Sequence, residues 1–193
     1  GAGKALSGQA SVTFTGALPD TMALGLLVAS SQFVVEGGAP TARPGPARLD
    51  FVWREGGPWH TETIEDSDSI VFHKAMVYDP PGDAAPGILT LGGGSVAAGA
   101  SGAAMLKLWR HGPSGWTSET LWTESFGGRF NRMRDAEVAP LYGTTAGPGG
   151  VVGDAIAVAT HDMGVVAVVS VASAGGYHVS RIDQQPTTFV HEI

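Results

Sequence analysis

Residues 104–122 read AMLKLWRHGPSGWTSETLW: an apolar run, a turn with Gly and Pro, and a second run that ends in Leu-Trp. The same arrangement occurs 56 residues earlier, where Trp53-Arg54 stands in the place of Trp109-Arg110. In both copies a turn with Gly follows and leads to a second Trp. Short apolar runs bounded by Gly and Pro are typical of β-strands. The recurrence therefore indicates a repeated β-sheet unit.

A third copy of the unit follows with looser matches. Tyr177 stands where the second copy has Trp116, 61 residues later. Each unit is predicted to hold four strands, and the first to contain a Pro-rich excursion over 37–47 before its third strand. The residues that begin the successive units are Ser11, His73, Arg134 and His191. The strands are expected near 72–78, 87–92, 104–110 and 116–122 in the second unit, and near 134–139, 154–160, 165–171 and 177–182 in the third.

Four-stranded units of this length, joined by short turns, are typical of β-propeller blades. A small twisted sheet cannot bury both faces alone, so neighbouring blades pack face to face around an axis. We predict an all-β protein in which residues 1–193 form one β-propeller segment: three four-stranded blades plus the first strand of a fourth. The blades are expected at about 9–66, 69–124 and 130–184, and the extra strand at 188–193. The alternative, a β-sandwich of about twelve strands, would not explain the matched Trp-Arg pairs.

Three blades and a fraction do not close a ring, because propellers typically have about four to eight blades. The open blade faces would leave apolar surface bare, which favours aggregation. We therefore expect a partner chain to complete the ring, either a second copy or a different protein. The alternative is a truncated segment of a longer propeller.

The loop between the first two strands of the second unit runs from Asp79 through Gly82 and Asp83 to the strand that contains Ile88. It resembles the Asp-x-Asp-Gly-Asp-Gly-x-x-x-Ile-Leu signature of FG-GAP/VCBS-type propeller repeats. The resemblance implies a propeller from a functionally broad family, in which carboxylates at the first, third and fifth loop positions often hold Ca²⁺. Most carboxylates are missing here, so we expect no strong Ca²⁺ site. The three positions are Ala17, Pro19 and Thr21 in the first loop, Asp79, Pro81 and Asp83 in the second, and Pro140, Tyr142 and Thr144 in the third.

The composition limits the possible functions. The net charge is −7 and no long basic run occurs, which argues against nucleic acid as a partner. The absence of Cys excludes disulfides, Cys-ligated zinc and a thiol nucleophile, and fits either a reducing compartment or an exported protein. The longest apolar stretch, around Val165–Ala172, is too short to span a membrane. We expect an extracellular or periplasmic protein.

One rim of the predicted propeller gathers polar side chains. By analogy with the fold, the first strand of each blade lines the central channel, so the residues that begin the blades would ring its mouth. Two or three imidazoles with a carboxylate can hold Zn²⁺ or a similar metal. We predict His73, His161 and His191 as ligands of one divalent transition metal, His73, Arg134 and His191 as catalytic groups, and Lys74, Asp135, Asp162 and Glu192 as substrate-binding groups.

The alternative for these residues is structural, because water fills propeller channels and favours polar side chains there. Without a metal, a His and an Arg that face one pocket would bind a carboxylate or take part in proton transfer. Arg129 and Arg132, in the loop before the third unit, are interpreted as rim charges, with anion binding as the alternative.

Two functions remain open at this point. The first is a ligand-binding or assembly module that recognises a carbohydrate or a protein through its channel rim. The second is a metal-dependent lyase, isomerase or dehydratase acting on a sugar-like or small polar substrate, with the metal polarising a carbonyl group. The sequence leaves open whether the protein is an enzyme.

Overall fold

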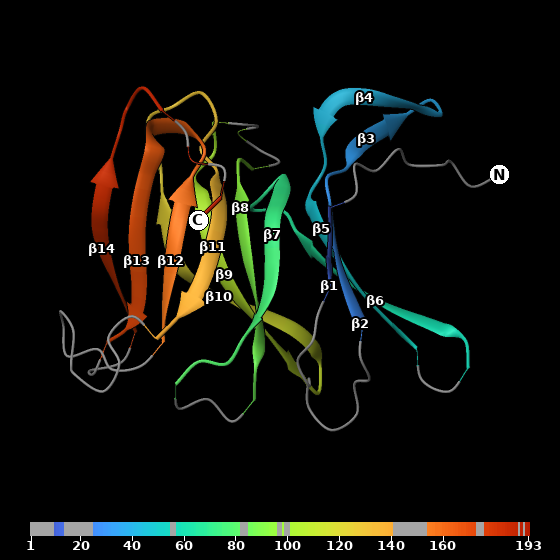
Figure 1. Ribbon diagram of the computed structural model, residues 1–193. Coiled ribbons are helices and arrows are strands. Elements are labelled where there is room, and N and C mark those ends of the chain that lie inside the picture. Colours follow the sequence, from blue (N-terminus) through green and yellow to red (C-terminus); the bar gives the residue numbers. More distant parts are fainter. Residues whose placement is uncertain are drawn as a thin grey trace.

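The computed structural model of the chain describes residues 10–13, 25–54, 57–81, 85–95, 98, 101–140, 154–172, 176–188, 190 and 192–193. These residues form three four-stranded antiparallel sheets and one two-stranded hairpin (Figure 1). Within them, helical structure is limited to a short 3-10 turn at Asp162–Gly164. The prediction of an all-β protein is confirmed, and none of the sheets closes on itself.

The first sheet has the strand order β1-β2-β5-β6. Its strands are β1 (Ala10–Thr13), β2 (Gly25–Ser30), β5 (Ala47–Arg54) and β6 (Trp59–Asp66). A separate hairpin of β3 (Phe33–Glu36) and β4 (Ala39–Pro44) lies at one end of the molecule (Figure 1). It only partly coincides with the Pro-rich excursion predicted over 37–47, because β3 precedes that range and Ala47 belongs to β5. Two glycines with positive φ, Gly37 and Gly38, form the tight turn of this hairpin.

The second and third sheets have the same antiparallel order as the chain itself. The second consists of β7 (Val71–Tyr78), β8 (Gly87–Gly93), β9 (Ala104–Gly112) and β10 (Gly115–Glu124). The third consists of β11 (Met133–Ala139), β12 (Ala155–Thr160), β13 (Val165–Val171) and β14 (Tyr177–Gln184). The eight strands predicted for these two units are confirmed.

The second sheet lies between the other two (Figure 1). Strands β2 and β5 contact β7 on one side, and β11 contacts β7, β8 and β9 on the other. This position explains why β8 is buried along its whole length: Ile88 faces the core shared with the first sheet, whereas Leu89 and Leu91 face the third. A strand that is buried on both faces is apolar throughout, as the run Ile88–Leu91 is except for Thr90.

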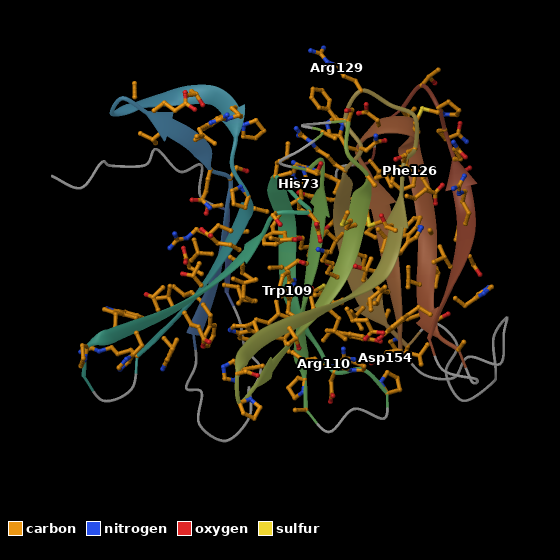
Figure 2. All side chains as sticks on the ribbon, turned by 180° about the vertical axis from the view of Figure 1, so that it is seen from behind. His73, Trp109, Arg110, Phe126, Arg129 and Asp154 are labelled. Carbon is orange, nitrogen blue, oxygen red and sulfur yellow. The ribbon has the colours of Figure 1, made fainter. Side chains whose placement is uncertain are left out.

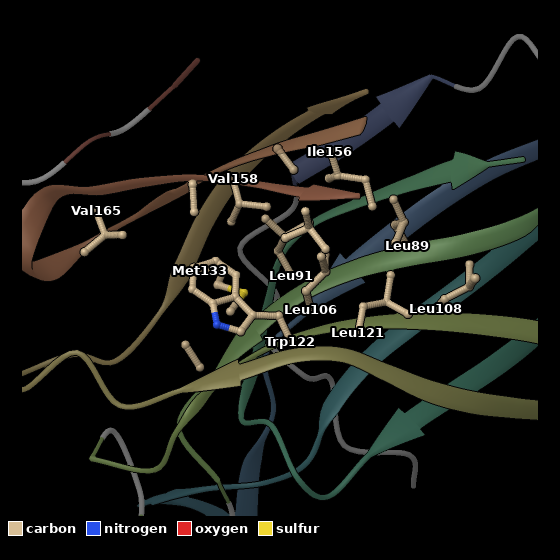
Figure 3. Packing of buried hydrophobic residues seen from close by; sticks show 14 of the residues in the cluster. Leu89, Leu91, Leu106, Leu108, Leu121, Trp122, Met133, Ile156, Val158 and Val165 are labelled. Carbon is tan, nitrogen blue, oxygen red and sulfur yellow. The ribbon is translucent and has the colours of Figure 1, made fainter. Parts of the chain in front are cut away.

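Two hydrophobic cores fill the two junctions between sheets. The core between the second and third sheets is shown in Figure 3 and includes Leu106, Trp122, Met133 and Val158. The other core packs Leu49 and Phe51 of the first sheet against residues of the second, among them Phe72 and Trp109. Burial of side chains of this size contributes about 1.5–3 kcal/mol each. The cores therefore fix the three sheets face to face.

The end of the chain is held against the third sheet. Val190 donates its backbone N–H to the carbonyl oxygen of Thr160, at 3.2 Å, and Thr160 is the last residue of β12. The strand predicted at 188–193 stays a prediction, because Phe189 and His191 lie outside the described residues.

Candidate functional site

Two β-bulges occupy the same place in the second and third sheets. The pairing of β7 with β8 shifts between Phe72 and Lys74, and the pairing of β11 with β12 shifts between Met133 and Asp135. A bulge inserts one extra residue, bends the strand and redirects the side chain. The inserted residues are His73 and Arg134, which the repeat spacing had placed at matching positions.

The two bulges bring His73 and Arg134 together. The Nη1 atom of Arg134 lies 2.7 Å from Nδ1 of His73. A guanidinium group only donates hydrogen bonds, so Nδ1 accepts and the ring proton of a neutral His73 sits on Nε2. Burial, followed by the charges of Arg134, Arg132 and His161, lowers the pKa of His73 to about 3. The imidazole is therefore neutral at physiological pH.

His73 Nε2 is buried and has no hydrogen-bond partner among the described residues. With the proton on this nitrogen, it is a donor without an acceptor. A buried polar group left without a partner costs about 1–3 kcal/mol. This orientation of the ring therefore favours a ligand or water oxygen beside Nε2.

Arg132 joins the same group of side chains. Its backbone forms an isolated β-bridge with Gly93. A Cβ atom added to Gly93 would lie only 2.1 Å from the carbonyl oxygen of Asn131. Its guanidinium stacks on Phe130, 4.6 Å from the ring centroid. Its Nε atom is buried and unpartnered, and within the described part of the chain no carboxylate lies within 4 Å of it. Burial and the nearby Arg134 lower the pKa of Arg132, and the charge of Asp162 opposes this shift without reversing it. We call His73, Arg132 and Arg134 the donor cluster.

His161 and Asp162 support the donor cluster from the turn after β12. Nδ1 of His161 lies 2.5 Å from Oδ1 of Asp162, and Oδ2 of Asp162 accepts the backbone N–H of Phe130 at 2.7 Å. Burial opposes ionisation of Asp162, but these two hydrogen bonds hold its pKa below the usual value. Gly128 approaches this carboxylate so closely that a Cβ would lie 2.2 Å from Asp162 Cβ. Asp162 is thus ionised and occupied in holding the loop that carries Arg132.

Lys74 and Asp135 pair with each other. Lys74 Nζ lies 2.8 Å from Oδ1 of Asp135 and 2.5 Å from Oε1 of Glu137. Burial opposes the charge on Lys74, but its hydrogen bonds to Asp135 and Glu137 raise its pKa. The second oxygen of Asp135 accepts the backbone N–H of Ile193 at 2.9 Å. Both predicted substrate-binding groups therefore have protein partners.

The other predicted rim residues are placed only in part. Ser11 pairs in register with Val28, without the bulge seen at His73 and Arg134, and its side chain lies outside the described residues. Glu192 is exposed, and His191 lies outside the described residues. The sequence indicates a rim charge at Arg132, with anion binding as the alternative. Strand alternation could not have grouped Arg132 with Arg134, because Arg132 precedes β11 and Arg134 is the residue inserted at the bulge.

The described residues contain no group of three His, Cys, Asp or Glu side chains that could hold a metal ion. The guanidinium groups beside His73 would also repel a divalent cation at short range. The donor cluster thus fits an anion better than a metal.

The calcium-type loops are described only in part. Of their nine positions, Asp79, Pro81 and Pro140 are described. The other six, Ala17, Pro19, Thr21, Asp83, Tyr142 and Thr144, lie outside the described residues.

No protein-family model, curated protein or solved structure matches this chain. The resemblance to FG-GAP/VCBS-type repeats therefore stays a prediction. None of the described residues form an apolar helix of membrane-spanning length.

Proposed function

We propose that the chain forms neighbouring blades of a β-propeller related to FG-GAP/VCBS repeats and serves as a ligand-binding module. The ligand is a small polar molecule or glycan that docks at the donor cluster. The observation that carries the proposal is the 2.7 Å contact between Arg134 Nη1 and His73 Nδ1, which leaves the Nε2 donor of His73 without an acceptor among the described residues.

The arrangement of the sheets supports the propeller. Three antiparallel sheets of four strands follow one another along the chain, and the second packs face to face against both neighbours. The first strand of the third sheet contacts the first strand of the second, as strands around a common axis would. Ring completion by a second copy or a different chain, and a location outside the cell or in the periplasm, belong to this proposal.

Binding explains the cluster better than catalysis does. A group with a pKa of about 3 is a weak base at neutral pH, which makes His73 a poor proton acceptor. Asp162 is the carboxylate of the adjoining turn, and both its oxygens have protein partners. The metal-dependent lyase, isomerase or dehydratase remains the alternative, with His73, His161 and His191 as ligands. Elemental analysis of protein purified without chelators would support it by finding a transition metal at one equivalent.

A glycan panel tests the proposed function directly. We expect at least one ligand to bind the native protein and to be lost in Arg134→Gln. The control is Arg110→Gln, which also removes one positive charge but lies at the opposite end of the sheets from His73 (Figure 2). Equal binding by the two variants would contradict docking at the donor cluster.

A further inference from the structure

We infer that the donor cluster binds a carboxylate group of its ligand. This inference rests on the proposed function, because it names the chemical group that the same site would recognise. It follows from the hydrogen-bonding roles, the charge and the shape of three side chains.

The nitrogens of the donor cluster that lack a protein acceptor are all hydrogen-bond donors. Arg132 Nε and His73 Nε2 are buried donors that have no acceptor in the part of the chain that the structure describes. The remaining nitrogens of both guanidinium groups can only donate as well. A ligand group that fits must therefore present acceptor oxygens and needs no donor of its own.

The donor cluster is positively charged, and this charge favours an anionic ligand just as its hydrogen-bond donors do. Arg132 and Arg134 are both partly buried, and among the described residues neither forms an ion pair. Other partly buried cations of this protein do form ion pairs, as Lys74 does with Asp135 and Glu137. An anion would offset both the desolvation of the two guanidinium groups and their mutual repulsion.

A carboxylate fits better than a doubly charged anion. The cluster holds two guanidinium groups, and Asp162 lies in the adjoining turn with its two carboxylate oxygens bonded to Phe130 and His161. A singly charged carboxylate would meet less repulsion from Asp162 than a phosphate dianion would. The planar fork of an Arg also matches the two oxygens of a carboxylate.

The test compares two sugars that differ in one group. Isothermal titration is carried out on the native protein with D-glucuronate and with D-glucose, which has a CH₂OH group in place of the carboxylate. We expect glucuronate to bind at least about tenfold more tightly, since hydrogen bonds to a charged group contribute about 1.5–3 kcal/mol. Arg132→Met should remove this preference. Arg129→Gln should retain it, because the exposed Arg129 carries the same charge in the same loop without belonging to the cluster.

A second readout does not depend on any variant. In ¹⁵N-labelled native protein, acetate and glucuronate should each shift the Nε2 resonance of His73, and glucose should not. Equal affinity for both sugars without a response to acetate would overturn the inference and leave the proposed function standing. A His73 resonance that ignores both anions would also overturn it. A response to acetate with no glycan bound would sustain the inference, contradict a glycan as the ligand and leave a small polar carboxylate as the ligand of the proposed function.

Discussion

Lys107 is buried and Arg132 is partly buried, but of the two only Lys107 forms ion pairs among the described residues. Lys107, in β9, is 3% exposed, and its Nζ lies 2.8 Å from both Asp66, the last residue of β6, and Asp68, which follows that strand. Arg132 has no carboxylate within 4 Å among the described residues. The ion pairs of Lys107 join the first sheet to the second, so their role is structural. Arg132 forms no such ion pair among the described residues, and in our proposal the carboxylate of a ligand supplies its counter-charge.

Removal of Lys107 should have the largest effect on stability. Lys107→Met leaves the buried Asp66 without its cation, and breaking a buried pair from one side costs about 3–5 kcal/mol. Urea denaturation of the two proteins measures the difference in unfolding free energy. A loss below about 1 kcal/mol would mean that the ion pair does not hold the junction, since exposed pairs contribute only that much.

Acidification should lower the unfolding free energy, because the buried His73 stays neutral while the unfolded chain gains a proton there. Its pKa is about 3 in the folded protein and about 6.5 in an unfolded chain, so between these values only the unfolded state binds the proton. The contribution of the neutral His73 to the unfolding free energy is fully present above pH 6.5 and declines as the pH falls towards 3. The decline attributable to His73 at pH 5 is about 2 kcal/mol.

The contribution of His73 is isolated by variants. His73→Gln should show a shallower loss of unfolding free energy between pH 7.5 and pH 5 than the native protein. His60→Gln, at an exposed position, should show the native slope. Identical slopes for native protein and His73→Gln would contradict the depressed pKa of His73.

Removal of Arg132 should not destabilise the protein. Arg132→Met keeps an apolar stem beside Phe130 and removes an unpaired buried donor and a charge that Arg134 repels. We expect the unfolding free energy to rise by roughly 0.5–1 kcal/mol, because an unpaired buried donor and a repelled charge are both removed. Thermal and urea denaturation measure it. A loss as large as that of Lys107→Met would show that Arg132 is structural.

The smallest effect is expected at an exposed ion pair. Arg43 and Glu36 pair across the β3–β4 hairpin, with side chains 59% and 61% exposed. Because solvent screens such pairs, Arg43→Gln should change the unfolding free energy by less than about 0.5 kcal/mol. The urea midpoint should therefore stay close to that of the native protein. A change above about 1 kcal/mol would indicate that exposure is a poor guide to the value of ion pairs in this chain.

Part of the candidate site could be predicted from the repeats. The spacing of 61 residues identified His73 and Arg134 as equivalent, and the structure places them at equivalent bulges. The contact between them was not predictable, because two equivalent residues meet only if the bulges turn their side chains to one another. Likewise, the repeats do not reveal that Arg132 lies near this pair or that Lys74 forms ion pairs with Asp135 and Glu137, because both depend on how the second and third sheets pack.

The β3–β4 hairpin was not predicted, but the sequence by itself determined the strands of the three four-stranded units and the turns between them. These follow from short-range physics: apolar runs such as Ile88–Leu91 favour extended backbone, and Gly and Pro end them. Only the tertiary structure decided which charges are paired. Lys107 and Asp66 are 41 residues apart, and no local pattern marks them as partners. Whether a buried cation has a counter-charge depends on how two sheets face each other, and here that difference separates a structural ion pair from a candidate binding site.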